Sequence, residues 1–423
     1  MNTSISVYAP FDTPRLRYVL DWILKERLGT QYTLTHDANA NVQLSYGAKN
    51  PAAISFPETG TLRLNASLDN LLSPLSLGEG PGVRPDFDVF AAIFSLLSRA
   101  EEYGPFESDK HGRYPAKASL LFRKGWLKIP VVDVWVDQLR KELNTRFGLA
   151  IPKPRFSFQP TYDIDIAYSY LHKGFRRTVG GLLRDLKSGN FPEISARLKV
   201  FSGKSPDPYD SFRWLRSLHA QYGLAPVYFM LAAQETGPFD KNISPAHPAM
   251  RTLAQSFALE GTVGIHPSYT TSEFPEKIAL EKTWLQNAVG KEIIHSRQHY
   301  IRLRFPQTYR QLLAAGIRHE YSMGYPDALG FRAGTSHSFL WYDLEKEEQT
   351  GLRVYPFCFM DTTARDYLGL SAAAAFEELE HLEKILSETG GKMTTVVHNF
   401  SLGTARDWPG WRDGYLRFVK SVV

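Results

Sequence analysis

The chain lacks the features of an exported, disulfide-stabilised or membrane-inserted protein. It has one cysteine, Cys358, among 423 residues, so no disulfide can form within it. The stretch from Met1 to Pro10 has neither a basic start nor an apolar core, which argues against a secretory signal peptide. No apolar run approaches the roughly 18 residues that cross a bilayer. We therefore expect a cytoplasmic protein without a membrane span.

The chain also lacks a block of charge of one sign, and its net charge is only +5. Two local groups of basic residues fall in expected helices: Arg15, Arg17, Lys25 and Arg27 in one, and Arg176, Arg177 and Arg184 in another. Such groups are typical of solvated helix faces, and no aromatic-basic motif of RNA-binding proteins accompanies them. We therefore expect no nucleic-acid partner.

What is present is the composition of a globular protein. Hydrophobic residues make up 43% of the chain and charged residues 22%, which is enough apolar surface for a sizeable core, and the length suits two domains. The aromatic fraction of 13% is fairly high. An aromatic core accounts for it, and a sugar-binding surface is the alternative.

A small mixed α/β domain is expected over residues 1–150. A strand at Ser4–Tyr8 precedes a helix that begins after Thr13 and ends just before Gly29. Further elements are expected as strands near Val42–Tyr46 and Ala53–Phe56, and as helices near Phe87–Glu102 and Val134–Phe147. The interval 73–85 is rich in Gly and Pro and follows neither period, so it predicts a flexible surface insertion.

Residues 151–423 are expected to form a second, larger domain. Pro152 and Pro154 stiffen the chain at the boundary. Apolar strands then alternate with helices, of which one of the clearest runs from Ser371 to Gly390. Seven strands are expected, near Phe156–Tyr162, Pro226–Leu231, Gly264–His266, Glu292–His295, Arg318–Tyr321, Val354–Met360 and Thr394–His398. This alternation predicts an α/β fold with a mostly parallel sheet, closed as a distorted (β/α)7 barrel.

Polar residues capable of chemistry fall where these strands end. Because side chains alternate along a strand, Asp163 and Asp165 point to the same face. Two adjacent carboxylates disfavour each other's ionisation, and a metal ion or a shared proton relieves that cost. Later strands end at His266, at Ser296–His299 and at His398. Carboxylates and imidazoles gathered at one end of a barrel predict a metallohydrolase.

The order of these motifs resembles the NodB-homology polysaccharide deacetylases (carbohydrate esterase family 4) over residues 156–423. Where that family has Thr-Phe-Asp-Asp-Gly, this chain reads Thr161-Tyr162-Asp163-Ile164-Asp165. The resemblance implies that Asp163 is the general base and that Asp165 is a metal ligand. One residue separates the two carboxylates here, so the two roles could also be exchanged.

The next two family motifs are matched in part. In the motif His-Ser/Thr-x-x-His, His266 matches the first ligand, and Thr270 stands in place of the second. The nearest replacement in chain order is His299, which we expect to be a metal ligand. In the Arg-x-Pro motif, Arg297 corresponds to the Arg that orients the base, and Arg304-Phe305-Pro306 is an alternative match.

The last motifs supply an acid and its partner. Asp361 corresponds to the Asp that polarises the catalytic His, and His398, in Val396-Val397-His398, corresponds to the general acid. The loop Gly330–Thr335 also looks like part of a site. There Arg332 could hold a substrate hydroxyl or carboxylate, and we expect Tyr269 to contact the substrate as well.

By resemblance, the cofactor is a divalent metal ion, Zn²⁺ first, and the substrate is an N-acetylated sugar of a glycan or of its precursor. The missing ligand at Thr270 leaves open a catalytically degenerate glycan-binding protein. Metal-dependent hydrolysis of an O-acetyl ester or a non-sugar amide is a further alternative. The leading segment, including Leu97–Tyr103 and Gly112–Pro115, looks like an uncharacterised domain that precedes some bacterial deacetylase-like proteins, and it implies no chemistry.

Overall fold

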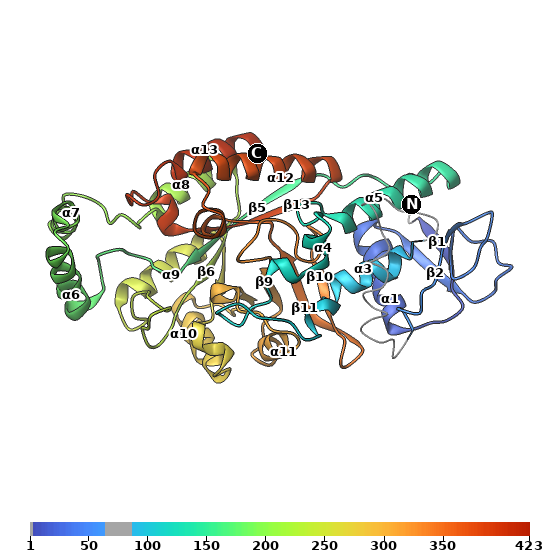
Figure 1. Cartoon of the computed structure of the whole chain (residues 1–423), viewed down its shortest axis with the longest axis horizontal. Coiled ribbons are helices and arrows are strands. Elements are labelled where there is room, and N and C mark those ends of the chain that lie inside the picture. The colour runs from blue at the N-terminus through green and yellow to red at the C-terminus, as the bar shows by residue number, and fades with distance from the viewer. Residues whose placement is uncertain (1–2, 64–86) are drawn as a thin grey trace.

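The computed structural model describes residues 3–63 and 87–423 (Figure 1). Within these residues the chain forms a four-stranded parallel sheet near the N-terminus and a nine-stranded, mostly parallel sheet after it. The expected insertion at 73–85 lies outside the described residues. The fold is therefore mixed α/β with two separate sheets, of which the larger is curled.

The smaller sheet has the strand order β2-β1-β3-β4. Its strands are β1 Ser4–Tyr8, β2 Gln31–Thr35, β3 Leu44–Tyr46 and β4 Ile54–Phe56. The central strand β1 buries Ile5 and Val7 completely. The sequence predicts β1, β3 and β4. It does not predict β2, because no side chain of this edge strand is fully buried and its apolar pattern is weak.

The helices of this leading region are α1 Pro14–Leu20, the π-helical η1 Asp21–Arg27, α3 Val89–Leu97, the short 3₁₀ turns η2 Ala100–Glu102 and η3 Ala116–Ala118, α4 Leu120–Arg123 and α5 Val131–Phe147. Thr13 caps α1, since its Oγ1 accepts the N–H of Leu16 at 3.2 Å. The helix predicted over residues 87–102 is interrupted at Arg99, whose φ of 55° an α-helix cannot include.

The larger sheet has the strand order β10-β11-β9-β8-β7-β6-β5-β13-β12. Its strands are β5 Ser157–Ile164, β6 Val227–Met230, β7 Thr262–Ile265, β8 His295–Ser296, β9 His319–Met323, β10 Phe339–Asp343, β11 Glu348–Pro356, β12 Phe359–Met360 and β13 Lys392–His398. Neighbours are parallel except for the antiparallel β10–β11 hairpin. Each of the seven predicted strands overlaps a strand of this sheet. The hairpin strand β10 was not predicted, because it falls outside the strand–helix alternation.

The larger sheet curls until its two sides approach each other. The N–H of Phe357 donates to the carbonyl of Met323 in β9 at 3.1 Å, and the N–H of Cys358 donates to the carbonyl of Thr394 in β13 at 3.2 Å. Consecutive residues between β11 and β12 therefore bond to strands on opposite sides of the sheet. The number of strands around the barrel depends on whether β11 and β12 are taken as one interrupted strand, so the predicted count of seven stays a prediction.

Eight helices accompany the larger sheet in the described residues: α6 Gly174–Lys187, α7 Phe191–Phe201, α8 Phe212–Tyr222, α9 Pro248–Glu260, α10 Glu276–Val289, α11 Gln307–Ala314, α12 Ala372–Thr389 and α13 Trp411–Val422. Short helical turns follow several strands: η4 Tyr269–Ser272, η5 His299–Ile301, η6 Thr363–Tyr367 and η7 Asn399–Leu402. α12 buries Phe376, Leu379 and Leu382, as its apolar stripe predicts. Across the described residues, no helix has the length and apolar character needed to cross a membrane.

The leading region (residues 1–150) and the region that follows it share one hydrophobic cluster, to which Trp22 and Trp341 both belong. Buried polar contacts join them as well. Trp22 Nε1 donates to the carbonyl of Ser338 at 3.1 Å, and Asp133 accepts a hydrogen bond from Thr335 Oγ1 at 2.6 Å. Because the core continues from one region into the other, the division into domains at residues 150 and 151 stays a prediction.

Candidate metal centre and active site

The predicted site residues follow the carboxyl ends of four parallel strands. Asp163 and Asp165 lie at the end of β5, His266 follows β7, the segment 297–299 follows β8, and His398 ends β13. Carboxyl ends of parallel strands meet at the same edge of a sheet. The strand order β8-β7-β6-β5-β13 brings these ends to neighbouring positions on the curled sheet, and the side chains lie within a few ångströms of one another.

Asp165, His266 and His299 form a cluster that can hold a metal ion, and we call it the Asp–His–His cluster. One possible ligand atom from each residue lies within 4.8 Å of the other two. Asp165 Oδ1 is 3.1 Å from His266 Nε2, and Asp165 Oδ2 is 3.4 Å from His299 Nε2. The two imidazoles therefore approach the same carboxylate from different strands.

The rings of His266 and His299 are each oriented by a hydrogen bond at Nδ1, on the side of the ring away from Asp165. His266 Nδ1 donates to the carbonyl of Arg297 at 2.6 Å, and His299 Nδ1 donates to Asp240 Oδ1 at 3.0 Å. A carbonyl and a carboxylate can only accept, so in each neutral ring the proton sits on Nδ1 and the lone pair on Nε2. Those lone pairs are directed at the carboxylate of Asp165.

This donor set fits a divalent cation. Asp165 Oδ1 is buried and has no hydrogen-bond partner among the described residues. A carboxylate facing two neutral imidazoles is unfavourable, and either a metal ion or a proton on one of the rings supplies the positive charge that stabilises it. One carboxylate oxygen and two imidazole nitrogens suit Zn²⁺ and other first-row divalent metals, and three protein ligands leave positions for water and substrate.

The local field also favours positive charge. Burial lowers the pKa of His299, but Asp165 and Asp240 outweigh burial and raise that pKa to about 9. Burial opposes ionisation of Asp165, yet His299 and His266 hold its pKa well below the ordinary value. The carboxylate therefore carries its charge inside the protein and is available as an anionic ligand.

Asp163 is held in a different way. Arg297 donates from Nη1 to Asp163 Oδ1 at 2.8 Å and from Nε to the carbonyl of Tyr321 at 3.0 Å, and its guanidinium is fully buried beside the ring of Phe229. The other carboxylate oxygen, Asp163 Oδ2, lies 3.7 Å from His266 Nε2. One oxygen is thus fixed by Arg297 while the second faces the Asp–His–His cluster.

His398 approaches the cluster from β13. Its Nδ1 lies 2.6 Å from Asp361 Oδ1, its backbone N–H donates to Asp361 Oδ2 at 2.7 Å, and its Nε2 lies 3.4 Å from Asp165 Oδ2. Burial lowers the pKa of His398, but Asp361 and Asp165 raise it well above the ordinary value. This arrangement holds a proton on an imidazole beside the cluster.

Sequence reasoning missed Asp240, which orients His299 and also accepts the backbone N–H of Tyr269 at 2.9 Å. Asp240 lies in the loop after β6, well past the strand end, so a search for polar residues at strand ends does not find it. Sequence reasoning also missed the backbone at Tyr300 and Ile301, where φ is 58° and 54°. Two consecutive left-handed residues other than glycine directly after His299 have no local sequence signal and are typical of a functional site.

Arg332 is a correction. Its side chain is 1% exposed, and its guanidinium pairs with the carboxylate of Glu102 in the leading region. A buried charge neutralised by a buried partner is not available to a substrate, so Arg332 joins the two regions and does not bind a sugar.

Tyr269 lies near the Asp–His–His cluster, but both faces of its ring are covered. Phe239 stacks on one side with ring centroids 4.0 Å apart, and the Arg302 guanidinium lies 4.0 Å from the ring centroid. The hydroxyl of Tyr269 is 3.0 Å from His111 Nδ1. The expected contact of Tyr269 with a substrate stays a prediction.

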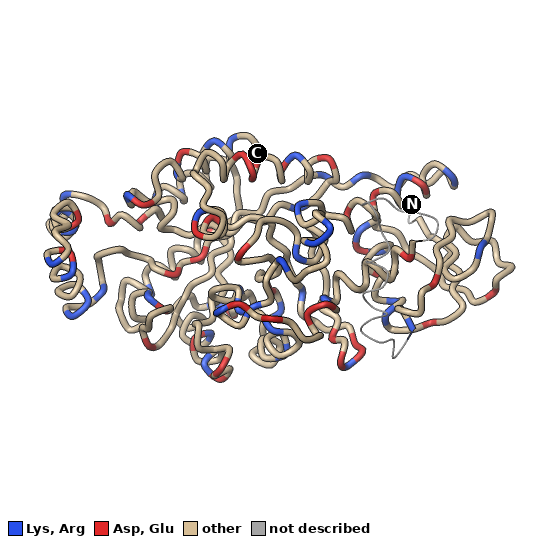
Figure 2. Tube along the Cα trace, in the orientation of Figure 1, with Lys and Arg blue, Asp and Glu red and all other residues tan. Residues whose placement is uncertain are grey.

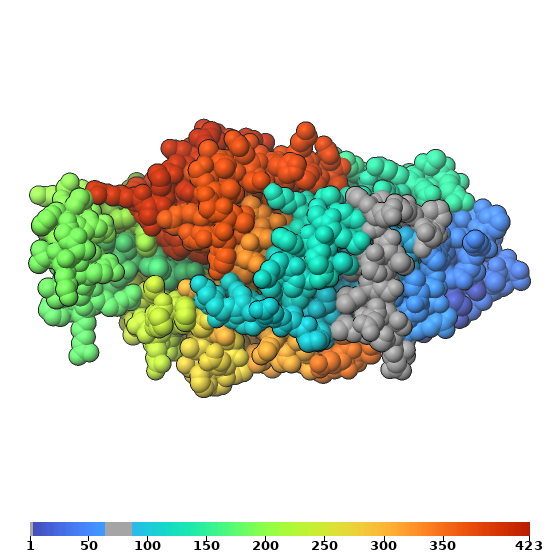
Figure 3. Space-filling view, viewed as in Figure 1, coloured from blue at the N-terminus to red at the C-terminus, as the bar shows by residue number. Residues whose placement is uncertain are grey.

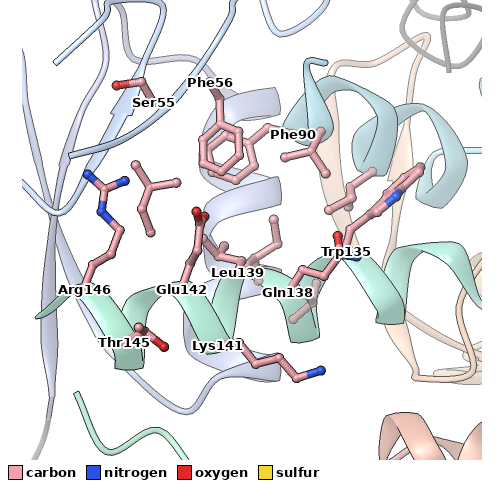
Figure 4. A pocket seen from close by; sticks show the side chains of 15 residues that line it. Ser55, Phe56, Phe90, Trp135, Gln138, Leu139, Lys141, Glu142, Thr145 and Arg146 are labelled. Carbon is pink, nitrogen blue, oxygen red and sulfur yellow. The ribbon is translucent and has the colours of Figure 1, made fainter. Parts of the chain in front are cut away.

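A cavity of about 710 Å³ lies elsewhere, in the leading region (Figure 4). It is lined by residues of β4, α3 and α5, with Phe56 on one side and Leu139 and Glu142 on the other. No residue of the Asp–His–His cluster lines it. Within the described residues, the chemistry and this cavity therefore belong to different regions of the molecule.

Comparison with known proteins gives a family model for the leading region alone. Residues 5–148 match a family of unknown function, DUF7033. No curated protein matches the chain.

Solved structures resemble part of the chain at low sequence identity. A protein from Mycobacterium smegmatis assigned to the polysaccharide deacetylases is 12% identical, with 64% of this chain and 85% of that chain covered and a TM-score of 0.41. The PuuE allantoinase is 11% identical, with 65% and 88% covered and a TM-score of 0.39. A polysaccharide deacetylase from Bacillus cereus is 11% identical, with 64% and 88% covered and a TM-score of 0.30.

Proposed function

We propose that the protein is a metal-dependent hydrolase that removes acetyl groups from N-acetylated sugars of a glycan or a glycan precursor. One observation carries the proposal: the Asp–His–His cluster has a second carboxylate, Asp163, on one flank and a proton-bearing imidazole, His398, on another. A base, an acid and an ion site within reach of one another are what hydrolysis of an amide requires. We propose a divalent metal ion, with Zn²⁺ as the first candidate.

In this proposal Asp165, His266 and His299 hold the ion, which when bound polarises the substrate carbonyl and makes water a better nucleophile. Asp163 takes the proton of the attacking water through Oδ2. Arg297 donates a hydrogen bond to the other oxygen at 2.8 Å, which fixes the direction of the carboxylate.

His398 gives its Nε2 proton to the leaving nitrogen, so that an amine departs instead of an amide anion. Asp361 accepts the Nδ1–H at 2.6 Å, and it therefore fixes the tautomer and stabilises the charged ring before the transfer. The distances favour Asp163 over Asp165 as the base, because Asp165 lies among three imidazoles whereas Asp163 has an oxygen directed at the cluster and an arginine behind it.

The surroundings of the cluster support a sugar substrate. The ring of Tyr300 lies 4.7 Å from that of His299, and the outer side of the Arg302–Tyr269–Phe239 stack ends in Phe239, which is 36% exposed. A flat apolar ring beside polar groups can pack against the C–H face of a pyranose. Phe239 therefore takes the role that the sequence assigns to Tyr269.

The test is acetate release together with metal content. Purified protein is loaded with Zn²⁺ and incubated with oligomers of N-acetylglucosamine, and acetate and bound metal are measured. Asp165→Asn should lose both metal and activity. The control is His381→Asn, a change of an exposed histidine on α12, which should leave both unchanged. Equal metal content in Asp165→Asn and the unmodified protein would defeat the ligand assignment.

The substrate series separates the alternatives. Acetate from an O-acetylated sugar or from a non-sugar amide, with none from N-acetylated oligomers, would move the function to those substrates. If the protein binds the oligomers but holds no metal and releases no acetate, it is a glycan-binding protein.

A further inference from the structure

α6 and α7 form a hairpin that lies apart from the other barrel helices. It is inserted between β5 and α8, and the two helices contact each other. Figures 1 and 3 show this α6–α7 hairpin (residues 174–201) projecting at the end of the molecule remote from the leading region. Apolar side chains on a helix pair that projects from the core are not explained by burial in that core.

The α6–α7 hairpin nevertheless exposes large apolar side chains in a short stretch. The exposed fractions are 82% for Phe175, 60% for Leu183, 58% for Leu186, 65% for Phe191, 55% for Leu198 and 41% for Phe201. Single exposed leucines are common on proteins, but six large apolar side chains on one helical hairpin form a patch that marks an interaction surface.

On α6 these side chains share one face. Phe175, Val179, Leu182, Leu183 and Leu186 follow the spacing i, i+4, i+7, i+8 and i+11, which places them along a single stripe of the helix. No side chain of this stripe is buried. α6 is therefore amphipathic, with its apolar stripe directed away from the protein core.

Packing between the two helices does not use that stripe. Arg197 of α7 pairs with Asp185 of α6 at 2.7 Å, and both side chains are buried. Gly181 lies in the same contact, since a Cβ there would come within 3.0 Å of the Arg197 guanidinium. Asp185 and Gly181 lie on a different side of α6 from Phe175 and Leu186. The helices are joined through a polar face, and the apolar stripe is left uncovered by this contact.

The same segment holds the excess positive charge of the chain. Between residues 173 and 204 there are eight Lys and Arg residues and two acidic residues, Asp185 and Glu193, whereas the whole chain has a net charge of only +5. Figure 2 shows Lys and Arg positions recurring along both helices. On α6 the stripe is bordered by Arg176 and Lys187. Apolar side chains bordered by basic ones match a surface with apolar tails under anionic headgroups.

We propose that the α6–α7 hairpin docks the protein onto an anionic lipid membrane surface. α6 and α7 have 14 and 11 residues, so each is long enough to lie in the interface and too short to cross a bilayer. The apolar side chains enter the acyl boundary while the basic side chains remain at the headgroups. We favour a lipid surface over a groove on another protein, because the excess positive charge of the hairpin is opposite in sign to anionic phospholipid headgroups.

The point at which the α6–α7 hairpin joins the barrel determines which edge of the larger sheet would face the membrane. β5 ends in the two site carboxylates, and the hairpin leaves the barrel ten residues after Ile164. The connecting chain is fixed by Asp207, whose carboxylate accepts the backbone N–H groups of Ser169, Tyr170 and Leu171 at 2.7, 2.8 and 3.0 Å. The hairpin therefore extends from the same edge of the sheet as the Asp–His–His cluster, and docking brings that edge toward the lipid.

The test is sedimentation of the full chain with phosphatidylcholine vesicles that do or do not contain phosphatidylglycerol. We expect binding only to the anionic vesicles and release at high salt. Leu183→Ser combined with Leu186→Ser should weaken the partition coefficient about tenfold or more. Arg176→Gln, Arg184→Gln and Lys187→Gln together should weaken it by roughly fivefold for each charge removed.

The matched control is Leu259→Ser combined with Leu280→Ser, which removes exposed leucines from α9 and α10, 89% and 59% exposed, and should leave vesicle binding unchanged. Far-ultraviolet circular dichroism of all variants shows that the helices persist. The proposal is overturned if the unmodified protein does not sediment with anionic vesicles. It is also overturned if the control variant weakens vesicle binding as much as the hairpin variants do.

Discussion

Two aspartates, one in each region of the molecule, show different uses of charge. Asp133 in the leading region is 1% exposed and pairs with Arg27 at 2.8 Å, and it accepts hydrogen bonds from Thr335 and Ser336. Asp165 in the second region faces the Nε2 atoms of His266 and His299, and its Oδ1 has no hydrogen-bond partner among the described residues. The protein satisfies the first carboxylate with an opposite charge and hydroxyl donors, whereas the second keeps an oxygen that can bind a metal ion.

The same contrast extends to whole regions. Buried charges that link the leading region to the barrel meet opposite charges, as Glu102 does with Arg99 and Arg332. The cavity of the leading region has a largely apolar wall, and the Asp–His–His cluster lies outside it. The two regions therefore use charge differently: buried charge in the leading region joins it to the barrel, and charge at the edge of the barrel forms a cluster that can hold a metal ion.

Asp163→Asn gives the largest expected effect, because it keeps the shape of the side chain and removes the base. Activity should fall by roughly 10³-fold or more, while metal content stays unchanged. Acetate release and elemental analysis of the same preparation check this. Loss of metal together with activity would show that the roles of Asp163 and Asp165 are exchanged.

Glu102→Gln tests whether buried charge in the leading region is structural. It leaves Arg99 and Arg332 buried without their shared carboxylate, which should cost roughly 3–5 kcal/mol in the free energy of unfolding. The control is Glu378→Gln, which breaks the exposed ion pair with Lys128 at 2.6 Å and should cost under about 1 kcal/mol. Urea unfolding measures both, and equal losses would remove the distinction.

His219→Gln tests how stability depends on pH at the contact between α8 and the larger sheet, where His219 meets the hydroxyls of Tyr162 and Tyr228. Burial lowers the pKa of His219 to about 4, so between pH 6.5 and pH 4 the unfolded chain binds more protons than the folded one. Stability should therefore fall as pH is lowered through this window, by roughly 2 kcal/mol between pH 8 and pH 5 for this group. Urea unfolding at both values should show a smaller change in the variant, whereas an unchanged difference would contradict the prediction.

Arg113→Ala tests whether the leading region supports the site across the boundary. Arg113 donates from Nη1 to the carbonyl of Tyr300 at 2.7 Å, in the left-handed turn that follows His299, and it pairs with Asp109. Losing this support should lower metal affinity and kcat by roughly tenfold, since a misplaced ligand weakens the ion site.

Two further variants complete that measurement. Arg113→Lys should recover part of the loss, and Arg123→Ala, at an exposed arginine of the same region, should change nothing. Metal affinity is measured by competition with a chelator. Unchanged affinity and kcat in Arg113→Ala would show that the two regions act independently at the site.

Much of the candidate site could be predicted from the sequence. The structure brings the predicted residues into one connected cluster, as their places at strand ends predict: Asp163, Asp165, His266, Arg297, His299, Asp361 and His398. The catalytic roles of these residues stay proposals. The reason for the success is local: strand periodicity fixes where a strand ends, and parallel strands end on a common edge.

Other features could not be predicted, because they depend on contacts between distant parts of the chain. Arg332 is directed into the protein by Glu102, which lies 230 residues earlier. Asp240 reaches His299 across 59 residues from a loop without strand periodicity. The apolar stripe of α6 looks like the core-facing side of any barrel helix, but in the structure α6 pairs with α7 through Asp185 and Arg197, and no residue of the stripe is buried.

The sequence by itself determined the α/β alternation and which carboxylates and imidazoles end its strands, because these are properties of short segments whose residues are neighbours in the chain. Only the tertiary structure decided which carboxylates meet an arginine and which face imidazoles, because the energy of such a charge depends on what lies a few ångströms away in space.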